Sequence, residues 1–105
     1  MSLDALVREH LNRAGADTTG RSSTTVFGGH ERVLRQTLIA LVAGVTMSEH
    51  ENPGEATLFV LRGRVRLIAD DVWDGRSGDM IVIPDSRHSL EALEDSAVLL
   101  TVAKL

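Results

Sequence analysis

Two histidines, His50 and His88, are the main candidates in this chain for a functional role. A neutral imidazole can bind a transition metal, take up a proton or orient a bound molecule by hydrogen bonds. Other reactive groups are scarce, because the 105 residues include no cysteine and no tyrosine. Disulfides, thiolate zinc sites, iron–sulfur clusters, thiol nucleophiles and phenol chemistry are therefore excluded. No Gly-x-Ser-x-Gly elbow supports a serine hydrolase.

The charge balance and the aromatic content argue against nucleic acid as a partner. Eleven Lys and Arg residues stand against fifteen Asp and Glu residues, for a net charge of −4, whereas binding to a phosphate backbone needs clustered basic side chains. Three aromatic residues, Phe27, Phe59 and Trp73, are few for stacking on bases. The longest apolar stretch, residues 38–45, is too short to cross a bilayer. We expect a cytoplasmic protein that binds neither nucleic acid nor membranes.

An amphipathic helix is predicted at the start of the chain, over residues 2–14. Ser2 is a suitable N-cap, apolar residues recur at three- and four-residue steps, and Gly15 is expected to end the helix. His10 falls on the apolar face, where a histidine usually serves packing rather than metal binding. A polar connector is expected over residues 15–23.

The elements that must position His50 and His88 are strands. From residue 24 to residue 104, short runs of Val, Ile, Leu and Thr alternate with turn signals rich in Gly, Pro, Asn and Asp. This spacing, without helical patterns between the runs, predicts an all-β fold, a single antiparallel β-barrel or sandwich. A chain this short supports one hydrophobic core, so we expect residues 1–105 to form one domain.

Two of these runs, residues 55–61 and 64–70, are separated by Arg62-Gly63, which predicts a tight hairpin. Because strand side chains alternate between two faces, the pairing would put one all-apolar set toward the interior. That set is Ala56, Leu58, Val60, Val65, Leu67 and Ala69. Arg62, Arg64 and Arg66 follow at two-residue steps, and we expect a solvated outer face there rather than an anion site.

The stretch from Gly44 to Gly63, with His50 inside it, resembles the first motif of the cupin superfamily, a Gly, five residues, His-x-His, a Glu and a closing Gly. The stretch from Gly78 to His88, with Pro84 inside it, resembles the second motif. Together they cover roughly residues 24–104. The resemblance implies a jelly-roll β-barrel, often dimeric, with its ligand site inside the barrel.

Cupins that hold a metal use two histidines and a glutamate of the first motif and a histidine of the second, and this sequence departs from that set. Anchored on Gly44 and Gly63, His50 takes the first histidine position, but the second falls on Asn52 and the glutamate on Ala56. An alternative alignment makes His50 the second histidine and Glu55 the glutamate. It displaces both glycines and puts Ser48 at the first histidine position. Neither alignment gives three histidines and a carboxylate, whereas transition metals usually need three or four protein donors.

Two functions follow as hypotheses, and the sequence leaves open whether the protein is an enzyme. The first is a non-catalytic cupin-like protein that binds a small, largely apolar molecule inside the barrel. The expected pocket residues are His50, Asn52, Ala56, Leu58, Val60, Val65, Leu67 and His88. The alternative is a metal-dependent dioxygenase or isomerase in which His50 and His88 hold Zn, Fe, Mn or Ni. A homodimer is expected in either case, because a small barrel leaves sheet edges to cover.

Overall fold

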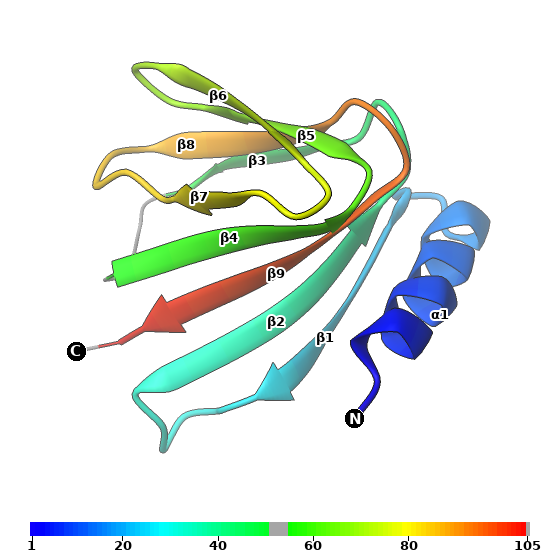
Figure 1. The fold of residues 1–105 in the computed structure, drawn as a ribbon, viewed down its shortest axis with the longest axis horizontal. Coiled ribbons are helices and arrows are strands. Elements are labelled where there is room, and N and C mark those ends of the chain that lie inside the picture. The colour runs from blue at the N-terminus through cyan, green and yellow to red at the C-terminus, as the bar shows by residue number, and fades with distance from the viewer. Residues whose placement is uncertain (51–54, 105) are drawn as a thin grey trace.

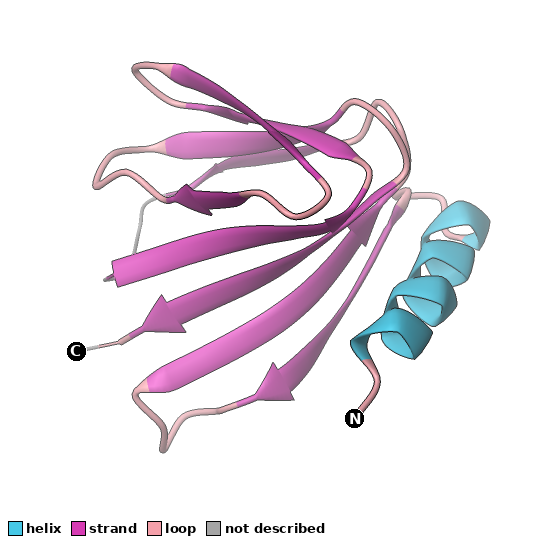
Figure 2. Cartoon of the chain, viewed as in Figure 1, coloured by secondary structure: helices cyan, strands magenta, loops and turns pink. Residues whose placement is uncertain are grey.

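A computed structural model describes residues 1–50 and 55–104, which form one helix and nine strands (Figures 1 and 2). The helix α1 (Leu3–Ala16) begins at Ser2, whose side-chain oxygen accepts a hydrogen bond from the Ala5 N–H at 3.1 Å. The predicted N-cap is thus confirmed. No helix in the described residues is long and apolar enough to cross a membrane.

The predicted end of the helix at Gly15 is wrong. Gly15 lies inside α1, and Asp17 is the C-cap, with its backbone N–H directed to the Ala14 carbonyl. Glycine can adopt helical dihedrals at a modest cost, so its presence alone does not stop a helix. The chain instead turns at Gly20, which has a positive φ of 71°.

The nine strands form two antiparallel sheets that face each other, as Figure 1 shows. The five-stranded sheet has the order β1 (Arg21–Phe27), β2 (Leu34–Leu41), β9 (Ser96–Ala103), β4 (Glu55–Arg62) and β7 (Met80–Val82). The four-stranded sheet has the order β3 (Thr46–His50), β8 (His88–Ala92), β5 (Arg64–Ile68) and β6 (Val72–Arg76). The prediction of an antiparallel all-β barrel of jelly-roll type with a short N-terminal helix is confirmed.

The first strand begins at Arg21, inside the segment predicted to be a connector. Its seven residues are mostly Ser and Thr, and they alternate between exposed and half-buried positions. Because β1 is an edge strand that pairs with β2 alone among the described strands, its sequence carries few of the branched apolar residues that mark an inner strand. The polar composition is therefore the reason why the start of β1 was not predicted from the sequence.

The predicted hairpin at Arg62-Gly63 is wrong, although its two strands exist. β4 pairs with β9 and β7, whereas β5 pairs with β6 and β8, so the described chain crosses from one sheet to the other at Gly63. Gly63 has a φ of 88°, and a Cβ atom there would overlap the carbonyl oxygen of Asp95 and the side chain of Ser96. Gly63 therefore makes a corner of the barrel, packed directly against the start of β9.

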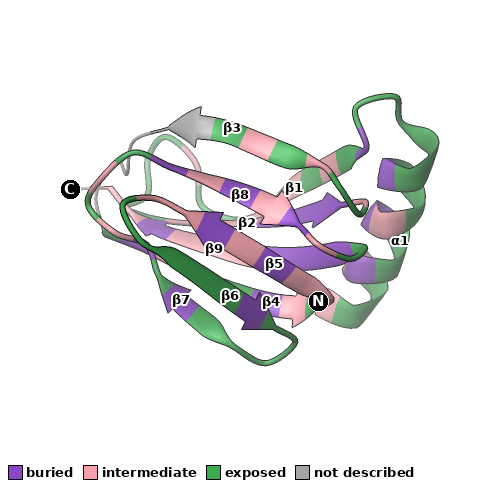
Figure 3. Ribbon diagram, turned by 90° about the horizontal axis from the view of Figure 1, so that it is seen from above, coloured by how far each residue is buried: buried purple, intermediate pink, exposed green. Residues whose placement is uncertain are grey.

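The core lies between the sheets, and strand alternation placed most of it correctly. Ala56, Leu58, Val60, Val65 and Leu67 are all buried in one apolar cluster. Ala69, the sixth residue of the predicted set, is only half-buried, because β5 ends at Ile68. The cluster also contains Ile39, Leu41, Ile81, Ile83, Leu90, Ala92, Val98 and Val102. Figure 3 shows the buried positions alternating with less buried ones along β8 and β5.

Helix α1 packs on the outer face of the five-stranded sheet, at its β1–β2 side (Figures 1 and 3). A second apolar cluster joins Val7 of the helix to Leu38 of β2 and Ala97 of β9. His10 is buried beside it, with an exposed fraction of 5%, which confirms the prediction of a packing histidine. The helix thus covers part of one sheet face and takes no part in the interior of the barrel.

Candidate binding site inside the barrel

The backbone brings the two histidines singled out in the sequence to adjacent strands. His50 of β3 and His88 of β8 are direct partners in the antiparallel pairing, beyond an irregularity that follows Met47. The side chain of His50 and the whole of Asn52 lie outside the described residues. The pairing therefore describes the Cα positions of the two residues. It is what the predicted convergence of the two imidazoles requires of the backbone.

His88 lies at the start of β8. Its side chain is buried, with an exposed fraction of 4%, and its Nδ1 lies 2.9 Å from the backbone carbonyl oxygen of Ser86. Because a carbonyl oxygen only accepts hydrogen bonds, this geometry assigns the Nδ1 atom as the donor. A neutral ring in that tautomer has its lone pair on Nε2, the atom with which it can accept a hydrogen bond or bind a metal.

A small cavity lies between the two sheets, and His88 forms part of its wall. The other lining residues are apolar and come from both sheets: Ile39, Met47, Leu58, Leu67, Ile83, Leu90 and Leu100. The cavity volume is about 20 Å³, which is room for about one water molecule. With the open solvent at its mouth, the empty space is about 290 Å³. The site is therefore apolar and nearly filled, with an imidazole in its wall.

The predicted pocket residues separate into three groups. Leu58, Leu67 and His88 line the cavity. Ala56, Val60 and Val65 are buried in the same core but do not line it. The remaining two, His50 and Asn52, are those for which no side chain is described.

Sequence reasoning missed five of the cavity residues. These are Ile39, Met47, Ile83, Leu90 and Leu100. In β2, residues 38–41 are all buried, because the barrel interior covers one face and α1 covers the other. Strand alternation therefore gives no signal there. The one usable signal is the polar–apolar alternation of β8, in which Leu90 shares its parity with His88.

A complete metal site is not found among the described side chains, which include no group of three or more His, Cys, Asp or Glu residues close enough to share an ion. His88 is surrounded in the cavity wall by carbon side chains and the thioether of Met47. Such a wall provides no carboxylate to offset the charge of a divalent ion. The described part of the site therefore does not fit the metal of the alternative hypothesis.

The arginines predicted to form one row do not share a sheet. Arg62 ends β4, whereas Arg64 and Arg66 lie in β5 on the outside of the other sheet. Asp74 of β6 accepts hydrogen bonds from Arg66 Nε at 2.9 Å and from Arg64 at 3.3 Å. These hydrogen bonds, that from Arg66 first, hold the pKa of Asp74 below its ordinary value of 3.8. Arg64, Arg66 and Asp74 form an exposed ion-pair cluster, in line with the solvated outer face that the sequence predicts. This cluster lies away from the cavity.

The fold is that of an antiparallel two-sheet barrel with a small apolar cavity between its sheets. No protein-family model and no curated protein matches the sequence. Solved structures do match. A conserved protein of unknown function from Streptococcus pyogenes is 27% identical, with a TM-score of 0.75, over 85% of this chain and 78% of that one.

Two further solved structures that match are described as cupins. A RmlC-like cupin from Desulfovibrio desulfuricans is 24% identical, with a TM-score of 0.69, over 79% of this chain and 81% of its own. A cupin superfamily protein from Desulfitobacterium hafniense is 18% identical, with a TM-score of 0.73, over 81% of this chain and 78% of its own. The chain is therefore a small protein of cupin fold, and the resemblance of its two motifs is confirmed at the level of the fold.

Proposed function

We propose that this cupin-like protein binds a small, largely apolar molecule inside its barrel. The observation that carries the proposal is the composition of the cavity wall, seven apolar side chains and one buried histidine. Small-molecule sites are typically concave and apolar, with a few polar groups that fix the orientation of the ligand. The net charge of −4 and the absence of cysteine support a cytoplasmic protein without a nucleic-acid partner.

The size of the cavity limits the ligand. A volume of about 20 Å³ admits about one water molecule, so a larger ligand must displace part of the wall. Met47 is the best placed residue to move, because a thioether chain has three rotatable bonds and adapts to irregular space. The proposed ligand is accordingly a molecule of a few carbon atoms that enters from the mouth of the cavity.

The histidine decides which polar group the ligand carries. We propose that His88, the polar side chain described in the cavity wall, orients the ligand through a hydroxyl or N–H group, the groups that an imidazole nitrogen can accept from. His50, opposite His88 in the strand pairing, is proposed as the second polar group. Asn52 follows it in the chain and is proposed to line the same mouth.

A titration with short-chain alcohols tests this proposal. We expect butanol and its branched isomers, at millimolar concentration, to raise the melting temperature and to shift the methyl NMR signals of Leu58, Leu67 and Leu100. In His88→Leu, which keeps an apolar wall, we expect butane-sized hydrocarbons still to bind and the preference for alcohols to disappear. Val72→Lys, on the outside of the other sheet, is the matched control and should bind as the parent does. Shifts confined to surface residues would overturn the proposal.

A further inference from the structure

A groove separates the free edges of the two sheets on one side of the barrel. β6 ends the four-stranded sheet and β7 ends the five-stranded sheet, and each pairs with one neighbour in the described chain (Figures 1 and 3). The groove has a volume of about 340 Å³. Small-molecule sites usually measure about 300–1,000 Å³, so the groove can hold a ligand without any movement of its walls. Its lining residues, none of which lines the interior cavity, are Trp73, Asp74, Asp79, Met80, Ile81 and Val82.

The single tryptophan of the chain forms part of this groove. Trp73 is paired with Leu67 across β5 and β6, and residues directly opposite one another in an antiparallel sheet share a face. Leu67 is buried in the core, so Trp73 occupies an inward-facing position, and yet 37% of it is exposed. The opposing strand β7 has only three residues and leaves part of the indole uncovered. An indole usually buries a large area, so this uncovered part is a surface for a ligand.

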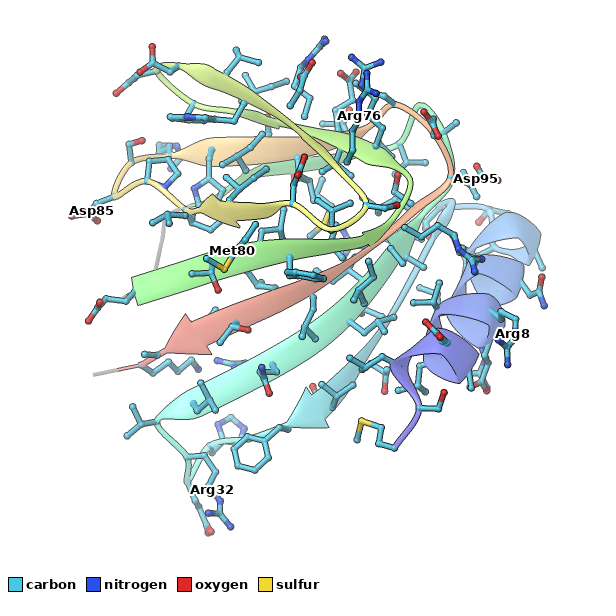
Figure 4. The ribbon with its side chains drawn as sticks, in the orientation of Figure 1. Arg8, Arg32, Arg76, Met80, Asp85 and Asp95 are labelled. Carbon is cyan, nitrogen blue, oxygen red and sulfur yellow. The ribbon has the colours of Figure 1, made fainter. Side chains whose placement is uncertain are left out.

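A carboxylate stands at the end of the groove where the β6–β7 turn closes it. Asp79 Oδ2 accepts a hydrogen bond from the Arg76 backbone N–H at 2.8 Å, and the Asp79 N–H donates to the Arg76 carbonyl oxygen at 2.8 Å. In the described part of the chain, no basic side chain forms an ion pair with Asp79. Figure 4 shows the Arg76 side chain above the four-stranded sheet, away from Met80, which lies beside β4. The charge of Asp79 is therefore available to a ligand.

The second carboxylate of the groove already has cationic partners. Asp74 accepts hydrogen bonds from Arg66 Nε at 2.9 Å and from Arg64 at 3.3 Å. A ligand cation beside Asp74 would meet these two guanidinium groups, whereas a cation beside Asp79 meets a carboxylate alone. The two ends of the groove are therefore different, and a ligand with one positive charge has a preferred direction in it.

The wall between the two ends is apolar. Ile81 is buried, and it lies so close to β6 that a Cβ atom on Gly75 would be 3.0 Å from its Cδ1 atom. Met80 and Val82 form the β7 side, with exposed fractions of 61% and 70%. Trp73 precedes Arg76 by three residues, so at about 3.3 Å per residue the indole stands about 10 Å along the strand from the turn that holds Asp79.

We propose that this groove binds a small organic cation, an ammonium group joined to an apolar body about 10 Å long. Asp79 pairs with the ammonium group, while Met80, Val82 and the indole of Trp73 cover the apolar body. The adaptable thioether and the flat indole suit an apolar body of varied shape, and the net charge of −4 attracts cations to the protein. The groove is thus a second ligand site, distinct from the interior cavity in position and in the charge of its ligand.

The fluorescence of Trp73, the only tryptophan of the chain, tests the proposal. We expect n-hexylammonium chloride, at millimolar concentration, to change this emission along a saturable curve and to shift the methyl NMR signal of Met80. Hexan-1-ol has the same carbon chain without the charge, and should bind the groove roughly tenfold more weakly. Ethylammonium is too short to reach Trp73 from Asp79 and should leave the emission unchanged.

Asp79→Asn separates the charge of the groove from its shape. The amide oxygen of the variant can still accept the hydrogen bond from the Arg76 N–H, so we expect the fold to persist, and a melting curve checks it. Hexylammonium should then bind only as weakly as hexan-1-ol does. Asp70→Asn removes the same charge from the exposed β5–β6 turn, outside the groove. It is the matched control and should bind hexylammonium as the parent does.

Three outcomes would overturn the proposal. Equal binding of hexylammonium and hexan-1-ol to the groove would show that it does not select a cation. Equal weakening in Asp79→Asn and Asp70→Asn would show a general effect of net charge. Hexylammonium shifts in the methyl signals of Leu58 and Leu100, without one in Met80, would put the amine in the interior cavity. The alcohol titration of the cavity is independent of all three, because the two sites share no lining residue.

Discussion

The Nδ1 atom of His10 lies 2.7 Å from the Oγ atom of Ser22, a partly buried contact that joins α1 to β1. Replacing His10 by Ala leaves a cavity and an unpaired hydroxyl, so we expect a loss of about 1–3 kcal/mol in the free energy of unfolding. Urea denaturation followed by circular dichroism measures it. Ser22→Ala and the double variant complete a cycle in which we expect a coupling energy of about 1 kcal/mol.

The control for this cycle is an exposed pair on the same helix. Arg13 and Glu9 form a surface salt bridge at 2.7 Å, with exposed side-chain fractions of 64% and 48%. Glu9→Ala should change the free energy of unfolding by less than about 0.5 kcal/mol, since exposed pairs of this spacing contribute little. Equal losses for Glu9→Ala and His10→Ala would show that His10 contributes through helix propensity and not through Ser22.

Two glycines provide a second prediction, because replacing each by alanine should change the free energy of unfolding in opposite directions. Gly63→Ala forces a side chain into a φ of 88° and against the backbone at Asp95 and Ser96, so we expect a loss of about 2–4 kcal/mol. Gly15 lies inside α1 with no atom within 4 Å of the position of an added Cβ. Gly15→Ala should therefore stabilise the protein by about 0.5–1 kcal/mol. Thermal unfolding of both variants measures the difference, and a neutral Gly63→Ala would contradict the corner assigned to Gly63.

Alternation along single strands was enough to predict much of the core. Leu58 and Val60 were placed inside from their own strand, and Leu67 from its neighbour, because a buried face must be apolar whatever the strand pairs with. The pairing itself depends on distant segments. Arg62-Gly63 has the local pattern of a hairpin, but β9, more than thirty residues further on, takes the place beside β4 that the hairpin gave to β5.

The candidate site, like the core, could be predicted from the sequence only in part. His88 was predicted from a motif, and its burial follows from its parity with Leu90 in β8. Ile39 lies in the part of β2 that is buried on both faces, and Leu100 lies in β9, which is paired on both sides. No pattern within those strands tells which face meets the cavity. The nearly complete filling of the cavity could not be predicted either, since packing depends on how eight side chains from both sheets fit together.

The pH dependence of stability should report on Asp74. Hydrogen bonds from Arg66 and Arg64 lower its pKa in the folded protein from 3.8, so the unfolded chain binds the proton more readily. The stabilising contribution is therefore complete above the unfolded pKa and is lost as the pH falls from 3.8 through the lower folded pKa. Because the pair is exposed, we expect a small effect that weakens in molar salt.

Comparison with Asp74→Asn isolates this contribution. The difference in the free energy of unfolding between parent and variant should be largest above about pH 5 and should shrink toward about pH 3. Asp17, whose pKa is lowered by the Thr19 backbone N–H and hydroxyl, titrates alike in both proteins and cancels. A difference that stays constant over this range would show that Asp74 acts through packing rather than through its charge.

Metal content distinguishes the binding protein from the metal enzyme. A divalent ion needs three or four donors, and the described cavity wall has a single imidazole, His88, among carbon side chains and the thioether of Met47. We therefore expect untagged protein to contain well below one Zn, Fe, Mn or Ni ion per chain by elemental analysis. EDTA should leave the melting temperature unchanged. One ion per chain that is lost in both His50→Ala and His88→Ala, but kept in His30→Ala, would establish the metal-dependent alternative and overturn this prediction.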